Sequence, residues 1–153
     1  MKKFPHASDS STQRIAECSL RELIEVLVDS TLTPETLNLG EGVRVNIDGI
    51  SREKRILCEI YSRIGKLKSS QSDKVATDIL KLMLVERTLG GQWRKIICLA
   101  DLDAARSFQG HTWLGATVRQ FGFEIHVVDL PPSIRSSLLA AQAKQIMVNP
   151  PGG

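Results

Sequence analysis

Long hydrophobic runs are missing from this sequence of 153 residues. Its longest apolar stretches, around Ile79–Val85 and Ile96–Ala100, fall far short of the roughly 20 residues that a membrane-spanning helix needs. A secretory signal is missing as well, because Met1–Ser11 is mostly polar and contains no apolar segment behind a basic one. We therefore expect a cytoplasmic protein that is not inserted in a membrane.

Cysteine is scarce, with three residues that lie far apart at Cys18, Cys58 and Cys98. There is no CxxC pair and no cluster of cysteine with histidine, which excludes the usual patterns of a structural zinc site. An odd number of scattered cysteines also argues against a disulfide framework. The pattern indicates reduced thiols, as in a cytosolic protein.

A strong excess of charge is also missing, since the formal net charge is only +3. The distribution is uneven: between Arg52 and Lys74, seven basic residues outnumber three acidic ones, so this segment carries +4 and the remainder carries −1. A local basic patch attracts phosphate groups. The same pattern is equally typical of a solvated hairpin and loop.

The hydrophobic pattern predicts a single domain over residues 11–147, between flexible tails at 1–10 and 148–153. A chain of this length suffices for one core and is short for two domains. Apolar residues at helical spacing predict helices, and alternating or continuous apolar runs predict strands. The helices are expected near 11–30, 72–89, 113–121 and 132–146, and the strands near 43–48, 54–61, 94–100 and 123–128, with a connection at 33–42 that holds one helical turn or a short strand.

The order of these elements predicts the fold class. The first two strands are separated by a short turn, so we expect them to pair antiparallel. The later strands alternate with helices, which indicates right-handed parallel crossovers. Together these patterns predict an α/β domain of three layers, with a mixed central sheet of about four strands flanked by helices.

Two carboxylates stand on the predicted hairpin. Asp48 closes one strand and Glu59 lies on its neighbour, so strand pairing can bring their side chains together. Carboxylates a few ångströms apart repel each other unless one is protonated or a cation bridges them, and hard oxygen ligands suit Mg²⁺ or Mn²⁺. Tyr61, two residues beyond Glu59, points to the same side of its strand. A lysine there would orient an attacking water molecule, whereas tyrosine is neutral near pH 7.

These residues, in this order of elements, resemble the PD-(D/E)XK nuclease superfamily over Ser11–Val128. The longer string from VNIDGI through EIYSRIGKLKSSQSDK to FEIHVVDLP resembles a group of small actinobacterial proteins placed in that superfamily. The resemblance implies a restriction-endonuclease-like fold and Mg²⁺-dependent hydrolysis of DNA phosphodiester bonds. Two departures stand out: no proline precedes Asp48, and Tyr61 occupies the usual lysine position.

The resemblance also implies a set of metal ligands. Asp48 and Glu59 would bind Mg²⁺, or alternatively Mn²⁺, and the Ile60 carbonyl could complete the shell. Glu22 on the first helix would join through water, because a helical wheel places it at the edge of the apolar arc. A solvated glutamate is the plainer interpretation of Glu22.

The same resemblance implies roles for the basic residues that follow Glu59. Members of the superfamily move the lysine to other positions, so Lys66 or Lys68 would take its catalytic role. Gln71 and Lys74 could touch a phosphate, although they fit a simple polar helix face as well. The full set of expected DNA contacts is Arg63, Lys66, Lys68, Gln71 and Lys74.

Asp48 and Glu59 also have plainer interpretations. Asp48 precedes a glycine, and Asp-Gly is common in turns. Glu59 could be an exposed strand residue that faces Arg55 or Arg44. Neither role involves a metal ion.

Two functions therefore stay open. The first is a metal-dependent deoxyribonuclease. The second is a catalytically inactive module of the same fold that binds a protein or a nucleic acid, which Tyr61 favours. One small domain has no separate DNA-recognition part, so a homodimer or a partner protein would supply specificity.

Overall fold

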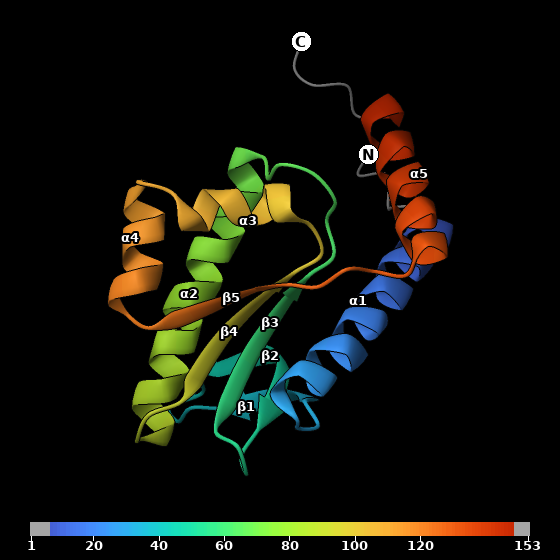
Figure 1. The fold of residues 1–153 in the computed structure, drawn as a ribbon. Helices are drawn as coiled ribbons and strands as arrows, with labels where there is room; N and C mark the ends of the chain where they lie inside the picture. Colours follow the sequence, from blue (N-terminus) through green and yellow to red (C-terminus); the bar gives the residue numbers. More distant parts are fainter. Residues whose placement is uncertain (1–6, 149–153) are drawn as a thin grey trace.

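The structure is a computed structural model that describes residues 7–148, and it has three layers (Figure 1). One mixed sheet of five strands forms the middle layer, with helices on both faces. No helix in this part of the chain is both long and apolar enough to cross a membrane. The elements are α1 (Ala7–Val28), β1 (Thr33–Asn38), β2 (Arg44–Ser51), β3 (Ile56–Tyr61), α2 (Ser69–Leu89), β4 (Arg94–Leu99), α3 (Leu102–Gln109), α4 (Trp113–Gln120), β5 (Phe123–Val127) and α5 (Pro132–Val148).

The strands lie side by side in chain order, β1-β2-β3-β4-β5. β1, β2 and β3 pair antiparallel, whereas β3, β4 and β5 pair parallel. The parallel connections run through α2 and through α3 with α4, because a crossover must return the chain to the start of the next strand. The expected antiparallel pair and the expected parallel connections are confirmed.

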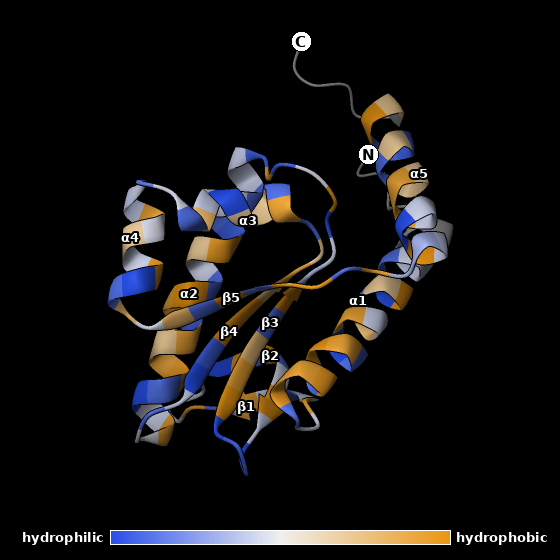
Figure 2. Ribbon diagram, viewed as in Figure 1, coloured by the Kyte–Doolittle hydropathy of each residue, from blue (hydrophilic) through white to orange (hydrophobic). Residues whose placement is uncertain are grey.

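Two hydrophobic cores lie on the two faces of the sheet. α2, α3 and α4 pack on one face, and α1 and α5 pack on the other (Figure 1). β3 is buried on both faces and is hydrophobic over most of its length (Figure 2). We call the first cluster the α2 core; its members include Ile47, Ile50, Leu57, Ile79, Leu82 and Phe108. We call the second cluster the α1 core; its members include Leu20, Ile24, Leu32, Cys58, Ile60 and Leu138.

β3 divides its side chains between these cores. Leu57 belongs to the α2 core, and Cys58 and Ile60 belong to the α1 core. Because side chains alternate along a strand, Glu59 lies on the same face as Leu57. The polar residue of β3 therefore points into the layer of α2.

Three parts of the chain differ from the expectation. The sheet has five strands rather than about four, because residues 33–38 form the edge strand β1. Only Leu37 of β1 is buried, so the segment lacks the alternation that marks a strand. The helix α3, of 8 residues, was not predicted. α1 begins at Ala7, within the tail expected at 1–10, while residues 1–6 and 149–153 lie outside the described residues.

β2 contains one extra residue next to Asp48. Thr33 pairs with Ile50 and Glu35 pairs with Ile47, so two steps along β1 match three steps along β2. An extra residue of this kind is a β-bulge, which re-aims side chains. Residues three apart lie on opposite faces of a regular strand, yet Ile47 and Ile50 both belong to the α2 core. The bulge therefore allows the adjacent residues Ile47 and Asp48 to face α2 together.

The lack of a side chain at Gly49 is required for this packing. A Cβ atom there would lie 2.9 Å from Leu32 Cβ and 3.7 Å from Cys58 Cβ, and the first distance is too short for two carbon atoms. We expect Gly49→Ala to lower the free energy of unfolding by about 1–3 kcal/mol, the usual cost of overpacking a core. Urea denaturation measures this change.

Gly110→Ala is the matched control. A Cβ atom at Gly110 would meet only Arg106 O at 3.7 Å, which is an ordinary contact. The backbone φ of −90° at Gly110 suits any residue. Equal free energies of unfolding for the two variants would contradict the tight packing at the bulge.

Candidate functional site

Asp48 and Glu59 lie on neighbouring strands and meet under α2. Gly49 pairs with Cys58 in the β2–β3 ladder, which places Asp48 across from Glu59. The two carboxyl groups are in hydrogen-bonding contact, and Asp48 Oδ2 accepts a hydrogen bond from Ile60 N at 2.9 Å. The structure thus brings the two predicted carboxylates together, and we call them the carboxylate pair.

The plainer interpretations of the carboxylate pair do not match the structure. Asp48 lies inside β2, which continues to Ser51, rather than in a turn. The Glu59 side chain is 4% exposed, so it is not a surface residue facing Arg55 or Arg44. Glu59 is therefore buried, and Asp48 is half-buried beside it.

The carboxylate pair holds a proton when no metal ion is bound. Burial and the neighbouring Asp48 carboxyl raise the pKa of Glu59 from its ordinary value of 4.5 to about 9, although Lys81 acts in the opposite direction. Two carboxyl groups share a hydrogen bond only when one of them is protonated. At neutral pH the pair therefore carries one proton, which a divalent cation would have to displace.

Lys81 of α2 supplies a positive charge beside the carboxylate pair. Its Nζ atom lies 2.8 Å from Glu59 Oε1 and 3.2 Å from Asp78 Oδ1, which is one helical turn earlier on α2. Burial lowers the pKa of Lys81, but the two carboxylates outweigh burial and raise it above its ordinary value of 10.5. Lys81 is therefore a cation at neutral pH.

Tyr61 is joined to this lysine through Asp78. The Tyr61 hydroxyl donates a hydrogen bond to Asp78 Oδ2, while Asp78 Oδ1 contacts Lys81. Burial, followed by the effect of Asp78, raises the pKa of Tyr61 above its ordinary value of 10.0, so the phenol stays neutral. A continuous set of contacts thus runs from Tyr61 on β3 through α2 and back to Glu59 on β3.

The lysines predicted to act at Glu59 lie elsewhere. Lys66 and Lys68 are exposed on the segment between β3 and α2. Lys68 precedes the first turn of α2, where its backbone N–H donates to Gln71 Oε1 at 2.8 Å. The expectation that one of them reaches back to Glu59 is not met, because the chain carries them past the end of β3. α2 instead returns over the sheet and places Lys81 there.

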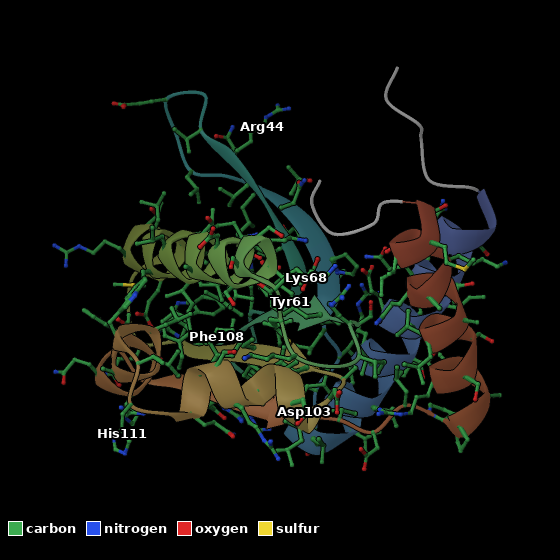
Figure 3. All side chains as sticks on the ribbon, turned by 90° about the horizontal axis from the view of Figure 1, so that it is seen from above. Arg44, Tyr61, Lys68, Asp103, Phe108 and His111 are labelled. Carbon is green, nitrogen blue, oxygen red and sulfur yellow. The ribbon has the colours of Figure 1, made fainter. Side chains whose placement is uncertain are left out.

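Part of the predicted DNA-contact set lies around one cavity. This cavity has a volume of about 220 Å³ and lies beyond the end of β3. Seen from above, Tyr61 and Lys68 lie between α2 on one side and α1 with α5 on the other (Figure 3). Three of the five predicted contacts line the cavity: Arg63, Gln71 and Lys74.

Glu22 is not part of the site. The buried residues Leu20 and Ile24 turn one side of α1 toward the sheet. Glu22 lies midway between them on the helix, and a step of two residues turns a side chain by about 200°, so Glu22 is exposed on the opposite side. The prediction failed because Ile15 and Val26 are apolar but 55% and 79% exposed, so they do not belong to the buried arc.

The sequence patterns did not point to Asp78, Lys81 or Glu17. Asp78 and Lys81 lie on α2 among its buried residues Ile79 and Leu82. A charged residue within such an apolar stretch needs a partner, and this is the signal that could have identified them. Glu17 is the acidic residue of α1 that lines the cavity beside Tyr61.

The carboxylate pair offers ligands of the kind that a hard divalent cation takes. Glu59 Oε1 is buried, and the charged group that it contacts is Lys81 Nζ at 2.8 Å. The N–H and C=O groups of a strand residue point to the same neighbour, so the Ile60 carbonyl faces the Asp48 side as its N–H does.

Mg²⁺ is commonly held by one or two carboxylates and keeps several waters. Two carboxylates and a carbonyl therefore fit this ion. Within residues 7–148, no group of three or more His, Cys, Asp or Glu side chains is placed to hold a metal ion. Water and a substrate phosphate would have to supply the remaining ligands.

This chain matches no protein-family model, no curated protein and no solved structure.

The raised pKa of Glu59 makes stability depend on pH. The folded protein binds this proton more tightly than the unfolded chain does, so the stabilisation is complete below the ordinary pKa of 4.5 and is lost as the pH rises toward about 9. The loss is at most about 1.4 kcal/mol per pH unit. We expect Glu59→Gln, which has no proton to release, to flatten the free energy of unfolding between pH 5 and pH 9, measured by urea denaturation with EDTA.

Other carboxyl groups with shifted pKa values act outside this window. Arg94 lowers the pKa of Glu124 to about 2, and the pKa values of Glu35 and Glu86 are also lowered. Their contributions are lost only as the pH falls below the ordinary value of 4.5. Glu124→Gln should therefore keep the wild-type slope above pH 5. Parallel profiles for the wild type and Glu59→Gln would show that the pair is not protonated.

Proposed function

We propose that this protein is a metal-dependent deoxyribonuclease that hydrolyses DNA phosphodiester bonds with Mg²⁺ or Mn²⁺. The observation that carries the proposal is the convergence of Asp48 on β2, Glu59 on β3 and Lys81 on α2. Two acidic residues and one lysine are the residue types that the resemblance to PD-(D/E)XK nucleases implies for this chemistry. Here the lysine comes from the helix rather than from the strand.

Each of these side chains has a distinct role in the proposal. Asp48 and Glu59 would hold the metal ion, with the Ile60 carbonyl facing the same place. A bound ion of this kind polarises the phosphate and lowers the pKa of its bound water. Lys81, a cation beside Glu59, would orient the attacking water and offset the charge that develops on the phosphate oxygens.

Tyr61 would act as a positioning residue. It stands at the usual lysine position but is neutral, so it does not provide the charge. Its hydroxyl instead donates to Asp78, whose other oxygen lies 3.2 Å from Lys81 Nζ. Tyrosine at this strand position is therefore compatible with catalysis by a lysine on α2.

Two further observations support DNA as the substrate. The three-layer α/β arrangement with a mixed sheet is the coarse architecture that the resemblance implies. The residues from Arg52 to Lys74 carry a net charge of +4, and this segment leads from the hairpin into α2. In the proposal, Lys66 and Lys68 contact DNA phosphates, and a homodimer or a partner protein supplies sequence specificity.

A second function is favoured by one observation. Glu59 is 4% exposed and already has Lys81 as its cationic partner. A buried ion cluster of this kind also occurs where its role is structural. The alternative proposal is therefore a catalytically inactive module that binds a protein or a nucleic acid.

Substitution of the three converging residues tests the proposed nuclease. We expect Asp48→Asn and Glu59→Gln to abolish cleavage of plasmid DNA, because each removes a charged metal ligand. Lys81→Met keeps the length of the side chain but removes its charge. We expect kcat to fall by about 10²–10³-fold, which is the usual cost of losing a preorganised group that stabilises developing charge. Nicking assays with Mg²⁺ and Mn²⁺ measure the rates, and circular dichroism verifies that each variant is folded.

Lys54→Met is the control, because Lys54 is exposed in the turn at the opposite end of β3 from Tyr61. The double variant Lys66→Ala with Lys68→Ala should weaken DNA binding and preserve the rate at saturating DNA. A wild type that cuts no DNA, or activity indifferent to Asp48, Glu59 and Lys81, would refute the nuclease and leave the binding module.

Metal binding should itself depend on pH. The shared proton has to leave before both carboxylates can act as ligands, and the pKa of Glu59 is about 9 in the metal-free protein. We therefore expect saturating Mg²⁺ to raise the Tm more at pH 8.5 than at pH 6, as measured by differential scanning fluorimetry. Asp48→Asn should lose the shift. An equal rise in Tm at pH 6 and pH 8.5, or a rise that Asp48→Asn retains, would mean that the ion binds away from the carboxylate pair.

A further inference from the structure

The cavity beyond the end of β3 is built from four elements. α1 contributes Gln13 and Glu17, the end of β3 leads into Arg63, α2 contributes Lys74, and α5 contributes Gln142. Its volume is about 220 Å³. Segments far apart in the sequence thus line one space next to the strand that carries Glu59.

Two cations line this cavity without an acidic partner. Among the ion pairs of residues 7–148, none involves Arg63 or Lys74. Arg63 Nε is buried and makes no hydrogen bond, although buried donors almost always have an acceptor. Lys74 Nζ lies 5.9 Å from the centre of the Tyr61 ring, a contact that uses none of its N–H groups as hydrogen-bond donors to oxygen. The cavity is therefore lined by two cations that form no ion pair with a described residue.

The acid of the cavity and two of its amides, Gln13 and Gln142, are already engaged. Glu17 Oε1 accepts a hydrogen bond from Gln13 Nε2 at 3.1 Å. Gln142 contacts both backbone groups of Ile64, accepting from its N–H at 2.9 Å and donating to its carbonyl at 2.9 Å. This double contact fixes the segment next to Arg63 against α5. The two cations thus stand in a preformed site, where they outnumber the one lining acid, Glu17.

We infer that this cavity binds a single phosphate group of a nucleotide, next to the carboxylate pair. A phosphate offers the oxygen acceptors and the negative charge that the guanidinium of Arg63 and the ammonium of Lys74 lack. The volume of about 220 Å³ is below the range of about 300–1,000 Å³ for pockets that take larger ligands. The cavity is therefore of a size for a phosphate with part of its sugar rather than for a whole base pair.

This inference specifies the substrate of the proposed function. A protein that encloses one phosphate with its sugar holds a single-stranded or terminal nucleotide rather than the middle of a duplex. The proposal that this phosphate belongs to DNA rests on the proposed nuclease activity. The binding of phosphate in the cavity does not depend on the metal site.

Nuclear magnetic resonance titration with EDTA present tests the cavity directly. Inorganic phosphate, and separately deoxyadenosine 5′-monophosphate, should shift the side-chain amide signals of Gln13 and Gln142. Arg63→Gln and Lys74→Gln should each weaken binding about tenfold or more, as the loss of a hydrogen bond to a charged group does. Lys74 is exposed, so its variant is informative even if Arg63→Gln fails to fold.

Arg87→Gln is the matched control, because it removes the same charge from the exposed end of α2. Binding of phosphate should be unchanged in this variant. No shift of the amide signals by millimolar phosphate would overturn the inference. Equal weakening in all three variants would do so too, since it would indicate general charge attraction.

The carrier of the phosphate is identified by comparing three ligands: the mononucleotide, a 5′-phosphorylated single strand and a duplex without terminal phosphates. Tight binding of the first two supports a single-nucleotide site, whereas binding of the duplex alone overturns it. Asp48→Asn separates the two proposals, because it should abolish cleavage and preserve phosphate binding. A wild type that binds phosphate in the cavity but cuts no DNA would support the cavity and refute the nuclease.

Discussion

The burial of two carboxyl groups side by side is the constraint on which the rest of the site depends. Glu59 is buried and Asp48 is half-buried beside it, and two neighbouring carboxylates without a cation are unfavourable there. A shared proton and the ammonium of Lys81 reduce the repulsion between the two carboxyl groups. In the proposal, a divalent cation takes the place of the shared proton. The proposed chemistry is thus a consequence of how these charges are buried.

The fold supplies this arrangement with ordinary structural means. The bulge in β2 turns Asp48 toward α2, and the alternation of β3 turns Glu59 the same way. The buried face of α2 then carries Asp78 and Lys81 over the pair. The side chains that pack the α2 core and those that form the site therefore share the same elements.

The strongly patterned parts of this structure were predictable from the sequence. Alternation identified β2, and the short turn that follows implied that β2 and β3 pair antiparallel, which is why the meeting of Asp48 and Glu59 was expected. The sequence left β1 open between a helical turn and a short strand, because only Leu37 of its residues is buried. Glu22 was misplaced because exposed apolar residues imitated a buried face. The sequence predicts Lys66 or Lys68 beside Glu59, whereas the packing of α2 on the sheet, which no local pattern records, places Lys81 there.

The position of a divalent cation tests the central claim most directly. Crystals of the wild type grown with Mn²⁺ allow the ion to be located by its anomalous scattering. We predict one strong peak at coordination distance, about 2 Å, from carboxylate oxygens of both Asp48 and Glu59. Absence of a peak there, with Lys81 still paired to Glu59 and the Asp48–Glu59 contact intact, would contradict a metal-dependent role for the carboxylate pair.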